Sequence, residues 1–234
     1  GLPEQPAHRA LASVEAALAL EPDHISAYTL TIEPDTVLAR RVRLGTFRPM
    51  PDEQQADLIE AVTHRLEAEG YRRYEVSSYA REGRISIHNT GYWVGGAYLG
   101  LGAGAHGYLP HAAGAVRYEN ERLPQRYQDA ALAGALETRF EEERGRRGQI
   151  EDRALVALRS AFGVDADAWA REFGPGWRSD AFVDGLERLA RQGFVERRDG
   201  RWRPNPRGFL FNDAVARAMI DLSARCWAEE GPLD

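Results

Sequence analysis

Hydrophobic residues in the first third of the chain switch between helical and strand spacing. In residues 7–22 they recur at helical intervals as far as Pro22, which cannot continue a helix. Residues 24–32, HISAYTLTI, alternate larger apolar side chains with small ones, which predicts a strand. Residues 51–70 predict a second helix, with acids in its first turn and Gly70 placed for a left-handed cap.

Two further segments, residues 71–80 and 97–109, have the composition of strands. Strands separated by long helices are typical of parallel βα units, so an α/β fold is predicted. In such folds functional groups gather at the carboxyl ends of the strands. The irregular stretch from His88 to Tyr108 follows a predicted strand and is therefore the expected place for a site.

The last half of the chain has a different pattern. After a predicted helix near 124–137, the charged run over 137–149 is expected to be a solvated connector. Three helices that end in glycine and one hairpin then follow, at residues 150–163, 165–174, 179–193 and 194–204. Asp199 and Gly200 supply the hairpin turn. Three helices and a hairpin predict a winged-helix-like domain.

The composition of the chain limits which partners it is expected to bind and which cofactors it can ligate. The 234 residues carry a formal net charge of -6, which gives no reason to expect nucleic acid as a partner, and the third helix of the winged-helix-like region has more acids than bases. No apolar run approaches the ~20 residues that span a bilayer, so a cytoplasmic location is expected. Cys226 is the single cysteine, so this chain cannot ligate an iron–sulfur cluster with its own thiolates.

The stretch from His88 to Tyr108 combines unusual residue types. It holds two histidines, three tyrosines, one tryptophan and seven glycines, a mixture that favours neither a helix nor an ordinary strand. One face of the predicted strand has no side chains at three positions, Gly100, Gly102 and Gly104. This allows close approach either of a flat ligand or of another stretch of backbone.

His88, Tyr92 and Trp93 form the most specific candidate site. A neutral imidazole nitrogen can bind iron, and the two aromatic rings offer flat surfaces to a macrocycle. Asn89 would fix the imidazole or cap the turn. Tyr92 is a second candidate for the iron ligand and His64 a weaker one. The alternative is that His88 only makes hydrogen bonds.

Several segments together resemble one known family. They are GLPEQ, HISAYTLTIEPDT, GYRRYEVSSYA, HNTGYW, YLGLGAGAHGY and RYEN, and they are similar in order to segments of the oxygen-independent coproporphyrinogen III oxidase family of radical S-adenosylmethionine (SAM) proteins. The chain departs from the family's commoner GLPGQT at Glu4 and Pro6. The HNxxYW pattern marks the heme-chaperone branch of that family, and its fixed positions are His88, Asn89, Tyr92 and Trp93.

The resemblance implies a fold and a division into domains. It implies the carboxyl-terminal part of an incomplete radical-SAM (βα) barrel at residues 1–110, a helical connector at 111–148 and a winged-helix-like domain at 149–234. The CxxxCxxC motif that holds a [4Fe–4S] cluster in this family is not in the chain, which suggests a piece of a longer protein or a truncated relative.

The resemblance also implies a function and its partners. The expected function is a heme chaperone that binds heme at the HNxxYW residues, with His88 as candidate iron ligand, and delivers it to respiratory proteins. The alternative is an oxygen-independent coproporphyrinogen III dehydrogenase. Thr31, Ala105 and His106 align with positions that touch SAM in relatives. Homodimerisation and membrane association through partners are further expectations.

Overall fold

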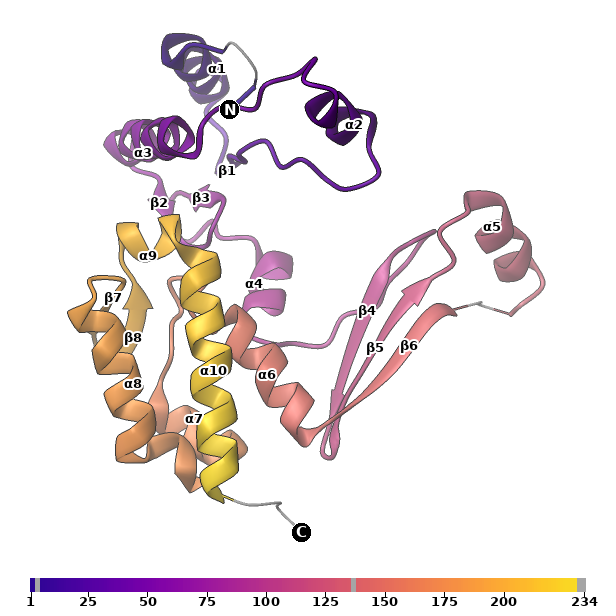
Figure 1. The fold of residues 1–234 in the computed structure, drawn as a ribbon, viewed down its shortest axis with the longest axis vertical. Helices are drawn as coiled ribbons and strands as arrows, with labels where there is room; N and C mark the ends of the chain where they lie inside the picture. Colours follow the sequence, from indigo (N-terminus) through magenta and orange to yellow (C-terminus); the bar gives the residue numbers. More distant parts are fainter. Residues whose placement is uncertain (3–4, 136–137, 231–234) are drawn as a thin grey trace. The chain divides into compact units, whose positions relative to one another are not determined.

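The computed structural model describes residues 1–2, 5–135 and 138–230, which form two compact units, residues 1–86 and 87–234 (Figure 1). Among the described residues, no helix combines the length and the apolar character that crossing a membrane requires. Glu4, one of the two departures from the family's GLPGQT pattern, lies outside the described residues.

The first unit contains the two helices that the sequence predicts. Helix α1 spans Ala7–Leu18 and helix α3 spans Asp52–Ala68. Gly70 has a φ of 84°, the left-handed conformation expected after α3. A short helix that was not predicted, α2, spans Val37–Arg43. The buried core of the unit consists of Leu58, Val62, Leu66, Tyr71 and Tyr79.

The strands of the first unit differ from the prediction. Strand β1 covers only His24–Ser26, and residues 71–80 form two short strands, β2 (Arg72–Arg73) and β3 (Ser78–Ala80), instead of one. The chain folds back between them because the Tyr74 N–H donates to the Ser78 carbonyl and the Ser77 N–H donates to the Glu75 carboxylate.

These three strands form a sheet in the order β1-β3-β2, and both pairings are antiparallel. The prediction of parallel strands is therefore wrong for the strands that the structure describes. Alternation of side chains predicts a strand but does not say in which direction its neighbour runs.

The second unit begins with helix α4 (Ile87–Trp93) and a three-stranded antiparallel sheet, in the order β4-β5-β6. Strands β4 (His106–His111) and β5 (Gly114–Asn120) form a hairpin, and helix α5 (Pro124–Leu132) connects β5 to β6 (Thr138–Gly145). The prediction of a connector at 137–149 is wrong, because β6 pairs with β5 and is followed directly by helix α6 (Arg146–Ala157).

The remainder of the second unit confirms the predicted helices and hairpin. Helices α7 (Ala166–Phe173) and α8 (Asp180–Arg191) are joined by a single 3-10 turn. Strands β7 (Val195–Arg198) and β8 (Arg201–Pro204) turn at Asp199 and Gly200, which have φ values of 53° and 76°. Helices α9 (Pro206–Leu210) and α10 (Asn212–Glu230) follow, and α10 carries the buried Cys226.

Four aromatic side chains fill the centre of this helical part. Trp169, Phe173, Trp177 and Phe182 are all 2% exposed or less, and their ring centroids lie 5.3 to 6.1 Å apart. Edge-to-face contacts at such distances add about 0.5–1.5 kcal/mol per pair to the hydrophobic contribution. The rings come from α7, the 3-10 turn and α8, so the cluster holds these elements together.

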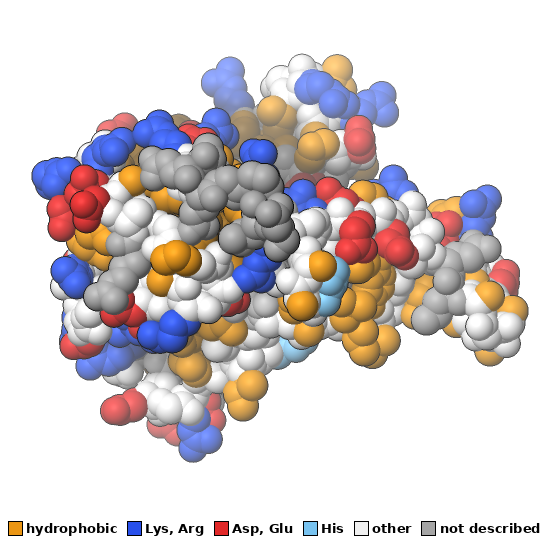
Figure 2. All heavy atoms as spheres, turned by 90° about the horizontal axis from the view of Figure 1, so that it is seen from below, with side chains coloured by type: hydrophobic (Ala, Val, Ile, Leu, Met, Phe, Trp, Pro, Cys, Tyr) orange, Lys and Arg blue, Asp and Glu red, His pale blue; other side chains and the backbone are white. Residues whose placement is uncertain are grey.

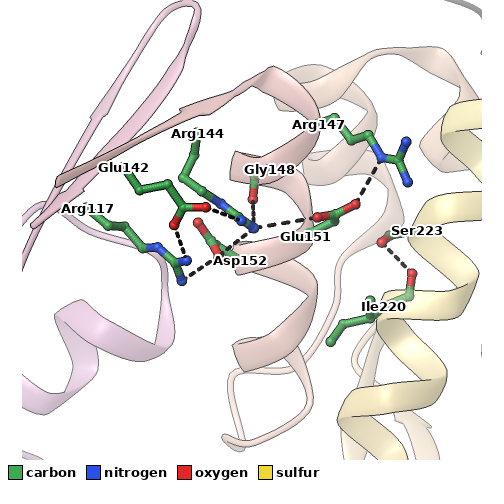
Figure 3. A network of polar contacts seen from close by, with 9 residues as sticks. All are labelled: Arg117, Glu142, Arg144, Arg147, Gly148, Glu151, Asp152, Ile220 and Ser223. Carbon is green, nitrogen blue, oxygen red and sulfur yellow. Dashed lines mark hydrogen bonds and ion pairs between the residues drawn. The ribbon is translucent and has the colours of Figure 1, made fainter. Parts of the chain in front are cut away.

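A network of charged side chains joins the sheet to helix α6 (Figure 3). Arg117 of β5 bonds Glu142 of β6 at 2.5 Å and Asp152 of α6 at 3.3 Å. Arg144 of β6 bonds Glu142, Asp152 and Glu151 at 3.1, 3.2 and 3.5 Å. Because these side chains are half-buried and share partners, the network fixes how α6 leaves the sheet.

The network predicts an acid-sensitive contribution to stability. The hydrogen bond from Arg117, with a second from Arg144, holds the pKa of Glu142 below its usual range. A carboxyl whose pKa is lowered on folding stabilises the fold above its unfolded pKa of about 4.3, and that contribution is lost as the pH falls further. Burial raises the pKa of Asp152. A carboxyl with a raised pKa favours the folded state more at low pH than at neutral pH, so Asp152 opposes the effect of Glu142.

We expect Glu142→Gln to reduce the loss of thermal stability between about pH 5 and pH 3, because the substituted amide cannot be protonated in this range. Thermal unfolding followed by circular dichroism at several pH values measures this. Glu141→Gln, on the same strand but exposed, is the matched control and should follow the unsubstituted chain. Identical pH profiles for Glu142→Gln and the control would contradict the assignment.

Truncation of a side chain in the aromatic cluster should cause a large loss of stability. Phe182→Ala removes a fully buried ring and should lower the free energy of unfolding by about 3–5 kcal/mol. Phe140→Ala, at a side chain that is 43% exposed, should cost about 1 kcal/mol or less. Denaturant titration followed by tryptophan fluorescence reports on this unit, because all five tryptophans lie within residues 87–234. Equal losses for the two variants would show that the cluster is not central to stability.

Candidate functional site

Helix α4 carries the candidate residues, although the sequence favoured a loop at this position. The hydrogen bonds at the C-terminal end of α4 explain why this glycine-rich segment forms a helix. The Gly96 N–H donates to the Gly91 carbonyl at 2.8 Å and the Gly95 N–H to the Tyr92 carbonyl at 3.1 Å. With Gly95 at a φ of 71°, these two bonds form a Schellman motif, which satisfies the last carbonyls of a helix. The glycines therefore terminate the helix rather than prevent it.

The helix brings His88 and Tyr92 together, one turn apart. The hydroxyl oxygen of Tyr92 lies 2.6 Å from Nε2 of His88, and the two rings meet edge to face with centroids 4.8 Å apart. His88 is exposed and Tyr92 is 37% exposed. Asn89 and Trp93 are half-buried on the same helix. The four HNxxYW residues thus share one short element, with the imidazole and the phenol hydrogen-bonded at its surface.

A row of tyrosines continues from this pair. Tyr98 meets the ring of Tyr92 edge to face at 4.5 Å and stacks on Tyr108 at 6.1 Å. The backbones of Tyr98 and Tyr108 exchange two hydrogen bonds, of 2.8 and 2.9 Å. Burial raises the pKa of Tyr98, and it raises that of Tyr108 to about 12, so both remain neutral phenols at physiological pH. Tyr98 therefore packs against Tyr92 as an uncharged ring, and Tyr108 packs against Tyr98 in turn.

The glycine-rich segment is a tight turn rather than a strand. At Gly100 a Cβ atom would lie 2.5 Å from the His106 carbonyl oxygen, so this glycine allows two stretches of backbone to approach. Gly102 and Gly104 have φ values of 108° and 69° and serve the turn. The buried Asn120 side chain donates to the carbonyls of Gly100 and Gly102, both at 3.0 Å. Of the two predicted explanations, close approach of backbone is confirmed at Gly100.

Arg153 of α6 anchors the end of α4. Its Nη1 donates to the Trp93 carbonyl at 2.9 Å, and its guanidinium lies 5.8 Å from the centre of the Trp169 ring. Burial lowers the pKa of this arginine, although the reference value is so high that the group stays charged. The bond connects the candidate helix to the aromatic cluster of the same unit.

Exposed apolar side chains flank the pair along the chain. Ile87 and Leu101 are 89% and 81% exposed, and Val94 and Leu99 are also exposed. Figure 2 shows one face of the molecule, on which apolar side chains are exposed among charged ones. Apolar surface beside a hydrogen-bonded imidazole and phenol could hold a flat, largely hydrophobic ligand that carries a metal.

The three residues expected at a SAM site are divided between the units. Thr31 is exposed in the first unit, directly after residues 27–30, which line an apolar pocket of about 450 Å³ with α1 and α3. Ala105 and His106 lie in the second unit, where the Ala105 carbonyl accepts from the Asn120 N–H at 2.9 Å and His106 begins β4. Their common role in binding SAM stays a prediction.

Sequence reasoning did not identify three residues that shape the site. Tyr98, Asn120 and Arg153 contact the candidate helix or hold the glycine-rich turn, but they lie 6 to 60 positions from the residues that they support. The segment RYEN, which contains Asn120, was the one available signal. It carried no indication of which backbone its side chains would bind.

Alanine substitutions at two glycines, one inside α4 and one just after its end, should change the stability of the helix in opposite directions. Gly95→Ala forces alanine into a left-handed conformation, at a cost of about 1–2 kcal/mol, and should speed amide hydrogen exchange in α4. Gly91→Ala, the matched control, adds a methyl group inside the helix with nothing within 4 Å and should slow exchange by stabilising α4 by roughly 0.5–1 kcal/mol. Changes of the same sign would contradict the Schellman assignment.

Comparisons with known proteins bear on this site. A model described as the HemN C-terminal domain matches residues 146–211. Two proteins named heme chaperone HemW are similar over most of the chain. The one from Bacillus subtilis is 32% identical over 94% of this chain and 57% of its own length, and the one from Mycobacterium tuberculosis H37Rv is 34% identical over 89% and 50%.

A solved structure is also similar in fold. It is described as coproporphyrinogen III oxidase (HemN) from Escherichia coli, a radical SAM enzyme, and it matches 95% of this chain and 52% of its own with a TM-score of 0.65 and 20% identity. The chain spans about half the length of the curated relatives that it matches. By these comparisons, most of the chain is similar in sequence to about half of proteins named heme chaperone HemW, and its fold is similar to that of HemN.

Proposed function

We propose that the protein is a heme chaperone that binds heme at helix α4 and delivers it to heme-requiring proteins. The observation that carries this proposal is the exposed pair of His88 and Tyr92, 2.6 Å apart, on a helix with all four HNxxYW residues. Relatives named heme chaperone HemW, similar over most of the chain, support the same function.

The residues of α4 suit heme as a cargo. His88 is the candidate iron ligand, since imidazole nitrogen is a common axial donor to heme iron. Tyr92 and Trp93 supply aromatic faces for the porphyrin, and Asn89 supports the helix beside them. The site is at the surface rather than in a closed cavity, so heme could leave by exchange of its ligand for one on the acceptor.

Other features of the complete protein belong to the same proposal. We expect a [4Fe–4S] cluster and SAM, with Thr31, Ala105 and His106 among the SAM contacts, because the family carries both cofactors. Respiratory proteins are the expected heme acceptors, with homodimerisation and membrane association through partners as further expectations. The cytoplasmic location likewise remains a prediction.

The finer description of the fold is also proposed. In it, residues 1–110 are the end of a radical-SAM barrel and 149–234 a winged-helix-like domain, and residues 111–148, predicted as a helical connector, lie between them. The β7-β8 hairpin supports the wing, as does the bridge that pairs Val164 with Trp202 beside it. The acid excess of α8 favours protein docking over binding to nucleic acid.

The alternative function is that of an oxygen-independent coproporphyrinogen III dehydrogenase in porphyrin biosynthesis. The fold similarity to HemN is what favours it. The intact HNTGYW segment argues against it, because the pattern marks the chaperone branch. Anaerobic conversion of coproporphyrinogen III to protoporphyrinogen IX by the complete, cluster-reconstituted protein would support the alternative.

Heme titration tests the proposal. Followed at the Soret band, His88→Ala should bind heme at least about tenfold more weakly than the unsubstituted chain, a difference of about 1.4 kcal/mol, with an altered spectrum. His64→Ala, at an exposed helical histidine of the first unit, is the matched control and should bind normally. Unchanged affinity and spectrum for His88→Ala would count against binding at α4.

A further inference from the structure

The short helix α2 (Val37–Arg43) and its C-cap Leu44 present one exposed face in the first unit. Four exposed positions fall at i, i+3, i+4 and i+7, namely Val37, Arg40, Arg41 and Leu44. Side chains with this spacing lie on the same side of a helix. Leu38 and Val42, on the opposite side, are half-buried. The exposed face is therefore a row of two arginines between two apolar side chains, which we call the α2 row.

The segment around the α2 row is basic and lacks acids. Residues 36–51 contain no aspartate or glutamate and four exposed arginines, Arg40, Arg41, Arg43 and Arg48. None of the four has an ion pair with another residue that the structure describes. Arg65 of the same unit, in contrast, pairs with Glu15 at 2.5 Å and with Glu69 at 2.6 Å. The segment is thus a local positive patch on a chain whose net charge is -6.

Local hydrogen bonds hold α2 in shape. At its start the Thr36 hydroxyl accepts from the Ala39 N–H at 3.1 Å. At its end the N–H groups of Gly45 and Thr46 donate to carbonyls of the last turn, both at 3.0 Å, which is a Schellman motif with Gly45 at a φ of 68°. Figure 1 shows α2 apart from α1 and α3 of the same unit, and α2 has no buried residue. Because a helix this short is unstable without support, these caps fix which face is exposed.

We propose that the α2 row binds the surface of a membrane that contains anionic lipids. Guanidinium groups bind phosphate through paired hydrogen bonds, and their long stems let them stay at the level of the headgroups. Val37 and Leu44 are 72% and 65% exposed, and in this position they can enter the boundary between headgroups and acyl chains. The inference is independent of heme binding. It adds a direct contact to the expected association through partners.

Nucleic acid also carries phosphate, but it suits the α2 row less well. The apolar ends of the row gain free energy only where they leave water, and a lipid interface offers this while a phosphate backbone does not. Proteins that bind single strands add aromatic side chains on which bases stack, and the row contains none. An anionic lipid surface therefore matches both the charged and the apolar members of the row.

Sedimentation of the 234-residue chain with lipid vesicles tests this proposal. At about 0.15 M salt, vesicles of equal parts phosphatidylglycerol and phosphatidylcholine should bind the chain at least roughly tenfold more tightly than vesicles of phosphatidylcholine alone. Arg40→Gln/Arg41→Gln should weaken binding to the anionic vesicles roughly 30-fold, because each arginine near such a surface contributes a factor of about five. Leu44→Ser should weaken it roughly tenfold through the loss of apolar contact.

A matched control separates the α2 row from the charge of the whole chain. Arg9→Gln/Arg72→Gln removes the same charge from exposed positions elsewhere in the first unit and should bind the anionic vesicles like the unsubstituted chain. All the substituted side chains are exposed, so thermal unfolding followed by circular dichroism should be unchanged in every variant.

Three results would overturn the proposal. The first is equal binding to both kinds of vesicle, or binding to neither. The second is an equal loss in the control and in Arg40→Gln/Arg41→Gln, which would indicate a general effect of charge. The third is normal vesicle binding by Leu44→Ser together with equally tight binding of the unsubstituted chain to duplex DNA, which would indicate recognition of phosphate in a nucleic acid. None of these results changes the heme titration that tests the proposed function.

Discussion

The bond from half-buried Arg153 to the carbonyl of Trp93 is the contact on which the candidate site depends. A guanidinium loses its hydration when it is buried, so it remains inside a protein only where carbonyls, acids or aromatic faces replace water. Here the Trp93 carbonyl and the Trp169 ring replace part of that water, whereas Nε of Arg153 has no hydrogen-bond partner in the part of the chain that the structure describes. Because the same side chain reaches both, the position of α4 is tied to the aromatic cluster of its unit.

These contacts hold helix α4 in place while its candidate ligand residues remain exposed to solvent. The glycines after Trp93 close the helix end, Arg153 holds it and Tyr98 supports the Tyr92 ring, while His88 and the Tyr92 hydroxyl remain at the surface. The proposed chaperone function requires that the cargo be held and also released to another protein. A preorganised donor pair on a supported surface helix meets both requirements, whereas a closed pocket would slow release.

The sheet β4-β5-β6 serves the site indirectly. Its first two strands hold Tyr108 and Asn120, which fix the tyrosine row and the glycine-rich turn. Its charged residues bond to α6, the helix that carries Arg153. The similarity to the HemN C-terminal domain begins at α6, so the region with this similarity also contains the helix that supports α4.

The sequence alone determined the helices with regular apolar spacing, the hairpin at Asp199 and the residues of the HNxxYW motif, because these depend on neighbours within a few positions. Only the tertiary structure decided that the strands run antiparallel, that residues 138–145 form a strand and that α4 is a helix. Strand direction and the supports from Tyr98 and Arg153 depend on contacts between distant positions, and local periodicity carries no record of such contacts.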